Sequence, residues 1–369
     1  MDGPDRTRTR ELIARIWTPP DSWEIPGEWF WWFWLFFIHD ENTIKTGKCR
    51  QVMILWSIKK DPKIRCNSLY IEFPLQLEKA WNGWKLNGAV AAWYFDGHDM
   101  HHDFVLEKSN MTVDMENKRL SAPGKTPSEF YLEGEEFVTR INGVGRTFEF
   151  RAKQTDRHPA VGPTFGASQL PGGMGVEGTR IEIMELSGFE TGEDGTKKGI
   201  AGTAYFQKIL VAVPPPQWYW GLYHFGDGSF FTYMVPYLGR AALAENLWGA
   251  NLRKPTLPIK QDLLLYHAPT CRIFSGKRLE VKPVKIGAGL WRHELRGGGK
   301  GFSVAGVADA YSHSSWKFIK KIGPLPSKSA FIYNEYPATA KLKLTLDSGE
   351  MIELENGWGN MENSWGFLI

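Results

Sequence analysis

Cysteine is scarce in this chain of 369 residues. The only three, Cys49, Cys66 and Cys271, lie far apart, and no two of them form a CxxC pair. An odd number of widely spaced cysteines argues against a disulfide framework and against a zinc site built from thiolates. We therefore expect a protein of a reducing compartment, the cytoplasm, with neither a bound metal nor another cofactor.

A surplus of charge of one sign is missing as well. The chain has 44 lysines and arginines against 41 acidic residues, so its net charge is only +3, and the basic residues are spread along it. A surface that binds nucleic acid needs a concentrated basic patch. The sequence therefore gives no reason to expect a nucleic-acid partner, and it does not indicate an oligomeric state.

Apolar runs long enough to cross a membrane are also lacking. The run Trp29–Ile38, WFWWFWLFFI, has ten residues, whereas a transmembrane helix needs about 20. The run follows a largely polar segment and ends at His39, which is not the layout of a secretory signal peptide. Aromatic residues favour strands, and a strand that is apolar on both faces must be covered on both faces. We expect both faces of this strand to be buried, one of them partly against a cavity.

Aromatic and turn-forming residues are abundant. Aromatic residues make up 14% of the chain, and it has 17 tryptophans, 39 glycines and 22 prolines. This composition, with little helical periodicity, is typical of an all-β protein. A chain of this length usually contains two domains. We place the boundary at Pro214–Pro216, because three consecutive prolines cannot lie in a central strand.

The predicted organisation has three parts: an N-terminal arm over residues 1–27, a β domain over residues 28–213 and a second β domain over residues 217–369. The arm contains a short amphipathic helix candidate near residues 10–17, and residues 153–177 are expected to form a long loop. Strands are predicted at 29–38, 50–58, 68–73, 88–96, 104–107, 111–114, 137–141, 147–152, 179–186 and 202–213, and hairpins follow at 218–237 and 341–354.

Four segments, taken in order, resemble one family. They are EWFW from Glu28, AWYFDGH at Ala92–His98, GTAYFQK at Gly202–Lys208 and WYWGLYHFGDGSFFTY at Trp218–Tyr233. They resemble the calycin-like proteins that join two lipocalin-type domains: carotenoid 1,2-hydratase (hydroxyneurosporene synthase), AttH-like proteins, tocopherol cyclase and the fungal decalin-forming Diels–Alderases. The resemblance implies an all-β fold of two consecutive lipocalin-like antiparallel β-barrel or β-sandwich domains.

The resemblance also implies a function. The expected partner is an elongated hydrophobic small molecule, a terpenoid, carotenoid or polyketide, held in an aromatic-lined cavity. The expected reaction is hydration, cyclisation, isomerisation or a pericyclic conversion without a redox cofactor. Ligand-binding residues are expected among Trp29, Trp31, Trp32, Trp34, Gln207, Trp218, Trp220, Tyr223 and His224.

Acid chemistry on an alkene requires a proton donor. In AWYFDGH, strand alternation places Tyr94, Asp96 and His98 on one face. If this face points into the cavity, Asp96 is a carboxyl group in an apolar pocket, and its pKa rises into the range of a general acid. If the face points to solvent, Asp96 ends the strand and His98 starts a turn.

The GTAYFQK segment departs from the hydratase-like pattern, which carries an aspartate-containing segment where Gln207 and Lys208 stand here. A glutamine cannot protonate an alkene. Tyr205 and Gln207 share a face and can hydrogen-bond a polar group of the ligand, so Tyr205 joins the candidate catalytic residues. Cyclase, isomerase, pericyclase and carrier functions remain open.

Other functions compete with this interpretation. His98 and His102 would lie about 13 Å apart on a strand, too far to share one metal ion. A non-catalytic carrier of lipids or isoprenoids would need the cavity and no acid. A carbohydrate-binding protein would use exposed aromatic platforms, and Trp358 and Trp365 in ENGWGNMENSWG have that character because they stand among polar residues.

Overall fold

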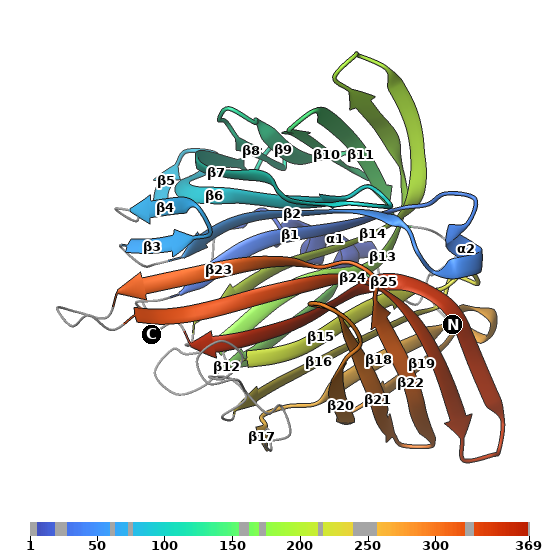
Figure 1. The fold of residues 1–369 in the computed structure, drawn as a ribbon. Coiled ribbons are helices and arrows are strands. Elements are labelled where there is room, and N and C mark those ends of the chain that lie inside the picture. The colour runs from blue at the N-terminus through green and yellow to red at the C-terminus, as the bar shows by residue number, and fades with distance from the viewer. Residues whose placement is uncertain are drawn as a thin grey trace.

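The computed structural model describes most of the chain, and nearly all of its elements are strands (Figure 1). The described residues are 6–18, 28–59, 63–72, 77–154, 162–169, 175–212, 217–238, 257–321 and 328–367. The proline connector at the expected domain boundary lies outside these ranges. No helix within them is long and apolar enough to cross a membrane.

The first sheet closes into a barrel. In the described part of the chain its strand order is β11-β10-β9-β8-β7-β6-β2-β1-β14-β13, and β13 pairs in turn with β11, which makes ten antiparallel strands without an open edge. They are β1 (Trp29–Ile38), β2 (Arg50–Lys59), β6 (Gly83–Phe95), β7 (Met100–Asp114), β8 (Arg119–Ala122), β9 (Ser128–Glu133), β10 (Glu136–Gly143), β11 (Arg146–Lys153), β13 (Gly175–Gly192) and β14 (Lys197–Val211). Two short strands, β5 (Leu77–Ala80) and β12 (Thr164–Gln169), pair with β6 and β13.

The second sheet has the order β19-β18-β16-β15-β25-β24-β22-β21-β20. Its strands are β15 (Gln217–His224), β16 (Phe230–Leu238), β17 (Leu257–Pro258), β18 (Asp262–His267), β19 (Arg272–Gly276), β20 (Arg278–Lys285), β21 (Trp291–Gly299), β22 (Phe302–Ala310), β23 (Ser314–Lys321), β24 (Lys328–Leu346) and β25 (Met351–Phe367). The hairpin of β3 (Lys63–Cys66) and β4 (Leu69–Glu72) joins this sheet through β23, although it comes from the first half of the chain. The two halves therefore interlock.

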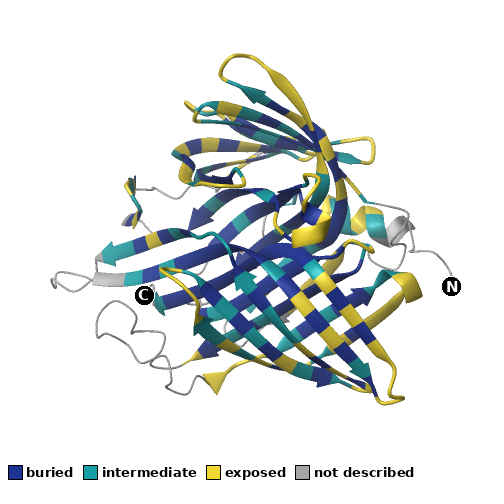
Figure 2. Ribbon diagram, turned by 45° about the vertical axis from the view of Figure 1, so that its right-hand side comes forward, coloured by how far each residue is buried: buried dark blue, intermediate teal, exposed yellow. Residues whose placement is uncertain are grey.

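Strand β1 explains why the sheets pack face to face. Its residues alternate between two hydrophobic cores: Trp32 and Trp34 point into the barrel, whereas Phe33 and Leu35 point toward the second sheet. Nine of the ten residues are buried and Trp31 is partly buried, so the expectation that both faces are covered is confirmed. Figure 2 shows buried residues concentrated where the sheets meet.

The barrel interior is filled with aromatic rings. The ring of Trp34 lies 4.7 Å from that of Phe206, and Phe36 stacks on Phe150 at 3.9 Å. Trp32 and Trp34 have no solvent-accessible surface. The barrel-facing side of β1 therefore packs on other side chains and does not border an open cavity in this structure.

The N-terminal segment is part of this core and is more than an arm. Helix α1 (Arg6–Ala14) leads into Ile16 and Trp17, which are both buried. The indoles of Trp32 and Trp84 donate hydrogen bonds to the carbonyl oxygens of Ile16 and Trp17 at 2.9 and 3.0 Å. These donors satisfy carbonyls that the end of a helix leaves unpaired. The remaining described helices are the short α2 (Thr43–Thr46) and η3 (Ala268–Thr270).

Two local expectations differ from the structure. The segments predicted at 104–107 and 111–114 are one strand, β7. The described residues of the loop predicted over 153–177 include β12 and the start of β13, and its residues 155–161 and 170–174 lie outside the described ranges. The first region has the polar residues Lys108, Ser109 and Asn110 between its apolar parts, and the second is rich in glycine, so both resemble a loop in the sequence. Their backbone hydrogen bonds to neighbouring strands, which local composition does not reveal, make them strands.

Candidate active site

The expected proton donor, Asp96, is a partly exposed carboxylate at the end of a barrel strand. It lies just past the end of β6 and accepts hydrogen bonds from the backbone N–H groups of His98 and Asp99 at 2.9 and 2.8 Å, while His101 Nε2 lies 3.0 Å from it. Partial burial raises the pKa of Asp96, but the hydrogen bonds from Asp99, His101 and His98 outweigh this effect and bring the pKa to about 2. Of the two alternatives for Asp96, the structure shows the one in which it ends the strand and His98 starts a turn, and a carboxylate capped in this way stays ionised at neutral pH.

Tyr94 and His98 do not share a site with Asp96. Tyr94 is buried in the barrel core, where its hydroxyl contacts Arg50 and burial raises its pKa. His98 is exposed in the turn after β6. The strand ends at Phe95, so the alternation that would have aligned the three side chains does not continue past it.

Two buried glutamates lie opposite each other where the second sheet faces the barrel. Glu335 on β24 and Glu362 on β25 are directly paired in the strand register. Their exposed fractions are 0% and 4%. Like charges directly opposite on a sheet repel each other, and burial disfavours the ionised form. Both effects favour the protonated form of at least one of the two carboxyl groups.

The pKa shifts follow from this placement. Burial raises the pKa of Glu362 to about 7, although hydrogen bonds from Tyr333 and Trp218 oppose the shift. Burial, and then the charge of Glu362, raise the pKa of Glu335 well above its ordinary value. Because the two carboxyls titrate as a unit, the pair retains at least one proton at neutral pH.

Aromatic donors from both sheets hold the acid pair. Trp93 Nε1 on β6 of the barrel donates to Glu335 at 2.8 Å, across 242 residues of sequence. Trp218 Nε1 on β15 donates to Glu362 Oε2 at 2.6 Å, and the hydroxyl of Tyr333 donates to Glu362 Oε1 at 2.7 Å. Trp93 lies at an irregularity in the pairing of β6 with β7, a feature that can re-aim a side chain. The site is thus assembled only when the sheets dock.

The barrel side of the interface contributes a third buried carboxyl group. Glu182 lies at an irregularity in β13, between Ile181 and Met184, which pair with Phe206 and Ala204 on either side of Tyr205 in β14. Burial raises the pKa of Glu182, and Arg180 opposes the shift. Burial, followed by the charge of Glu182, also raises the pKa of Tyr205 well above 10. The hydroxyl of Tyr205 donates to Gln207 Oε1 at 3.0 Å.

Tyr205 and the acid pair belong to one interface cluster. The ring of Tyr205 lies 5.6 Å from that of Trp220, and Trp220 stands opposite Glu362 in the pairing of β15 with β25. The charge of Glu362 is also among the causes that raise the pKa of Tyr205. Acidic and phenolic groups of both sheets therefore share one buried, aromatic environment.

The structure separates the expected ligand-binding residues into groups. Trp29, Trp31, Trp218 and Trp220 lie in the interface between the sheets. His224 is in the same interface, where its Nε2 lies 2.8 Å from the carbonyl oxygen of Glu182. Trp32 and Trp34 face the barrel core instead, and Tyr223 faces the core of the second sheet.

Sequence reasoning missed Glu335 and Glu362. The polar appearance of ENGWGNMENSWG left the carbohydrate-binding alternative open, but Trp358 and Trp365 are only 2% and 3% exposed and are not surface platforms. Trp358 Nε1 donates to Thr203 Oγ1 at 3.0 Å across the interface. A usable signal was the alternation of Trp358 and Glu362 on one face of a strand, which places a carboxyl beside buried aromatic residues.

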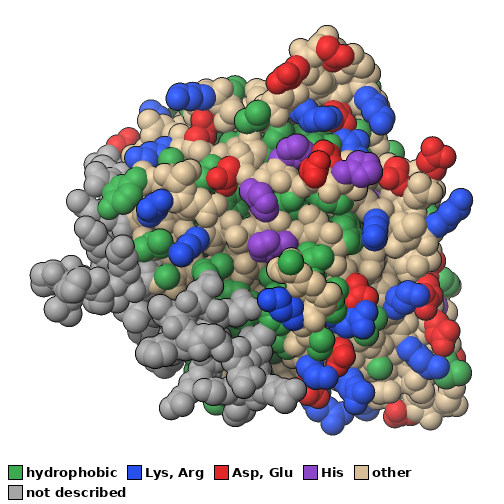
Figure 3. All heavy atoms as spheres, viewed as in Figure 1, with side chains coloured by type: hydrophobic (Ala, Val, Ile, Leu, Met, Phe, Trp, Pro, Cys, Tyr) green, Lys and Arg blue, Asp and Glu red, His purple; other side chains and the backbone are tan. Residues whose placement is uncertain are grey.

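Two other surface features are less suited to catalysis. Histidines gather on one face of the molecule (Figure 3), but no cluster of three or more His, Cys, Asp or Glu in the described residues could hold a metal ion. A groove of about 530 Å³ along β21, β22, β24 and β25 is lined by charged side chains. Two of these, Lys341 and Glu355, pair with each other at 2.7 Å.

Comparison with known proteins adds a fold likeness. No protein-family model and no curated protein matches the chain. A putative AttH from Nitrosomonas europaea superposes with a TM-score of 0.50 at 13% identity, over 94% of this chain and 98% of that one. Kievitone hydratase from Nectria haematococca gives 0.47 at 12% identity, over 92% and 89%. At these identities the likeness concerns the fold, and the expected class, an all-β protein of two lipocalin-like antiparallel units, is confirmed.

Proposed function

We propose that this protein is a hydratase- or lyase-type enzyme that adds water to, or removes water from, a hydrophobic ligand held between the two sheets. The observation that carries the proposal is the buried pair Glu335–Glu362, which keeps a proton at neutral pH among aromatic side chains. A general acid works best when its pKa lies near the working pH. The four sequence segments that resemble the calycin-like proteins, a group that includes hydratases and cyclases, agree with acid chemistry on such a ligand, although Gln207 departs from the hydratase-like pattern.

The chemistry needs no redox cofactor. A protonated carboxyl of the pair gives its proton to one alkene carbon, so that a C–H bond forms and the neighbouring carbon becomes a cation. The faces of Trp93, Trp218 and Trp220 stabilise that cation. Water adds to the cation and returns one proton to the carboxylate, which restores the acid. Dehydration is the same sequence in reverse, and capture by an internal hydroxyl gives cyclisation.

Ligand access requires movement of the site's outer wall. Glu335 and Glu362 are buried, whereas Trp218, Trp31 and Gln207 at the same interface are partly exposed. Trp218 covers Glu362 through its indole hydrogen bond. We propose that the ligand displaces this indole and takes its place beside the carboxyl group.

A carrier function is the second candidate. The observation that favours it is Gln207, which stands on the barrel side of the interface and can hydrogen-bond a ligand but cannot protonate it. A carrier would bind the ligand in the same place and would not need the raised pKa of Glu362. The two functions therefore differ in their dependence on the acid pair.

The proposed hydration can be tested by measuring the incorporation of ¹⁸O-labelled water into candidate substrates. Terpenoids, carotenoids and polyketides that contain an alkene are incubated with the protein in H₂¹⁸O, and mass spectrometry detects products that gain labelled water. Glu362→Gln is expected to lower the rate by about 10²–10⁴-fold, the usual size of a general-acid contribution. The control is Glu353→Gln, an exposed glutamate paired with Lys343, and it should be fully active. Ligand that binds without conversion, or conversion that survives in Glu362→Gln, contradicts the acid mechanism.

A further inference from the structure

Asn360 is a buried side chain that lacks hydrogen-bond partners. It has no exposed surface, and neither its Oδ1 nor its Nδ2 finds a partner among the residues that the structure describes. A buried amide normally pairs its donor and its acceptor, because removing them from water unpaired costs free energy. An asparagine in this state therefore calls for an explanation that the fold does not supply.

The position of Asn360 links it to the acid pair. It stands two residues before Glu362 on β25, so the two side chains share the face that points to the barrel, about 7 Å apart along the strand. In the strand register its neighbours are Pro337 on β24 and Leu222 on β15. Neither neighbour has a polar side chain, so the sheet cannot satisfy the amide.

A second unpaired acceptor approaches from the barrel. Gln51 on β2 is fully buried, and its Nε2 donates to the carbonyl oxygen of Gly359 at 2.9 Å and to the hydroxyl of Tyr311 at 2.8 Å. Its Oε1 finds no partner in the described part of the chain. Gln51 thus brings an acceptor next to the residue that precedes Asn360, from the opposite side of the interface.

We infer that Asn360, with Gln51, forms an oxygen-binding subsite that selects ligands carrying a hydroxyl group near the reacting carbons. This inference rests on the proposed function only in placing the ligand between the sheets. A hydroxyl group accepts from Nδ2–H of Asn360 and donates to one of the two free amide oxygens. A hydrocarbon does neither and leaves the amides unpaired. The substrate class is therefore an oxygenated isoprenoid or polyketide, and not a bare hydrocarbon.

The test compares two probes of the same carbon skeleton, farnesol and farnesene. Binding to the full-length protein is followed by quenching of tryptophan fluorescence, because Trp93, Trp218 and Trp220 belong to the same interface between the sheets. The wild-type protein is expected to bind farnesol about tenfold more tightly, which is the scale of one buried hydrogen bond. Asn360→Leu should remove this preference while binding farnesene as before. Asn110→Leu, at an exposed asparagine on β7, is the matched control and should keep it.

A second variant guards against loss of folding. Asn360→Ser keeps a donor and an acceptor and should retain part of the preference. Loss of the preference in Asn360→Leu with partial retention in Asn360→Ser supports the subsite, whatever happens to Tm. Equal binding of the two probes by the wild-type protein, no binding of either probe, or an unchanged preference in Asn360→Leu overturns it.

The outcomes also separate this inference from the acid mechanism. Glu362→Gln should keep the preference for farnesol while it loses the hydration activity. If Glu362→Gln is fully active and Asn360→Leu still loses the preference, the acid mechanism fails and the subsite stands. If Glu362→Gln is inactive and Asn360→Leu keeps the preference, the subsite alone fails.

Discussion

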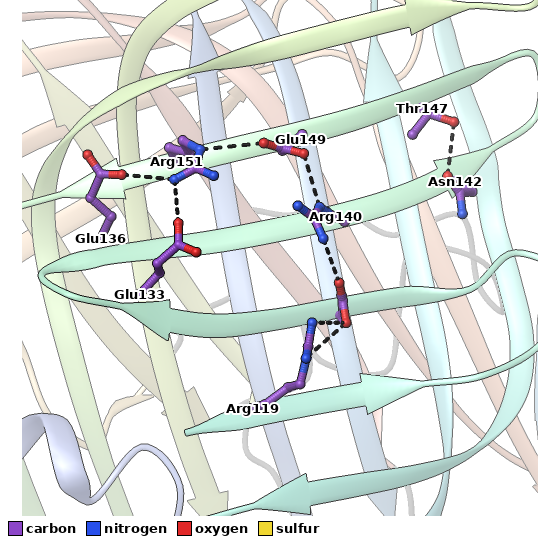
Figure 4. Close-up of polar contacts among 9 residues, drawn as sticks. Arg119, Glu133, Glu136, Arg140, Asn142, Thr147, Glu149 and Arg151 are labelled. Atoms are coloured by element: carbon purple, nitrogen blue, oxygen red, sulfur yellow. Dashed lines mark hydrogen bonds and ion pairs between the residues drawn. The ribbon is translucent and has the colours of Figure 1, made fainter. Parts of the chain in front are cut away.

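Glutamates on the outer wall of the barrel and glutamates between the sheets have opposite chemistry. On the wall formed by β8–β11, glutamates pair with arginines: Arg140 lies 3.0 Å from Glu149 (Figure 4). Glu129 lies 2.9 Å from Arg119 and 3.2 Å from Arg140. Partial burial raises the pKa of Glu149, but the hydrogen bond and charge of Arg140 outweigh it, so the pKa is lowered. Glu149 therefore stays ionised at neutral pH, and both glutamates are held in ion pairs with arginines on the outside of the barrel.

Between the sheets the guanidinium partners are replaced by aromatic ones. Glu335 and Glu362 accept hydrogen bonds from indole and phenol groups, which bring no full positive charge. Arg180 lowers the pKa of Glu362, but only as the smallest of the causes, and burial prevails. The hydrogen-bond partner therefore decides the role of the carboxyl group. A guanidinium keeps a carboxylate ionised, whereas a neutral donor at a buried site leaves a protonated acid that can donate its proton.

The largest expected difference between the buried and the outer glutamates is in their effect on catalysis. Glu335→Gln should lower hydration activity by about 10²-fold or more, because it removes one carboxyl from the proton-holding pair. Glu149→Gln should leave the activity unchanged and cost less than about 1 kcal/mol of stability, as expected for a surface ion pair. Rates with the labelled-water assay and urea unfolding of both variants check this. Equal loss of activity in the two variants would mean that the environment of the carboxyl group does not matter.

The next effect concerns the aromatic core inside the barrel, which lies on the other side of β1 from the interface. Trp34→Ala empties a fully buried site in the barrel and should lower the free energy of unfolding by about 3–5 kcal/mol. Trp81 is fully exposed, so Trp81→Ala should change the free energy of unfolding by less than about 0.5 kcal/mol. Denaturant titrations of the two variants measure the difference. A mild effect of Trp34→Ala would show that the barrel interior is not tightly packed.

The pH dependence of stability should have opposite signs for the two sets of glutamates. The pKa of Glu362 is raised from 4.5 to about 7 in the folded protein, so its contribution to stability is fully present below about pH 4.5 and is lost as the pH rises through about 7. The pKa of Glu149 is lowered, so its contribution is present above its unfolded pKa and is lost in acid.

The measurement is the free energy of unfolding of the wild-type protein minus that of Glu362→Gln, determined with urea at about pH 5 and about pH 8. The wild-type protein should lose stability relative to the variant between these two values. The same difference taken with Glu149→Gln should not fall over this range. A constant difference for Glu362→Gln would mean that its carboxyl has an ordinary pKa.

The smallest effect on activity is expected at Asp96, in the turn after β6. Asp96→Asn should change hydration activity by less than about twofold, because Asp96 is an ionised cap of a turn and not a proton donor. The variant is compared with the wild-type protein in the labelled-water assay at several substrate concentrations. A loss as large as that of Glu335→Gln would return the acid role to Asp96.

Local sequence was a good guide to the walls of this protein and a poor guide to its site. The strand Trp29–Ile38 and its two buried faces followed from ten apolar residues, since neither face could be left in water. Tyr205 and Gln207 were placed correctly on one face by alternation, and they do hydrogen-bond each other. Asp96 was misjudged because the strand ends one residue earlier, where backbone N–H groups cap the carboxylate.

The sequence by itself determined the all-β class and the residues that share a face of each strand, because side-chain alternation and apolar patterning are local properties. It could not determine which face meets which partner. That was decided by the register of β24 with β25, which sets Glu335 opposite Glu362, and by the docking of the barrel, which brings Trp93 to Glu335 from 242 residues away. A carboxyl group becomes an acid only when these distant segments remove it from water, and that burial exists only in the folded molecule.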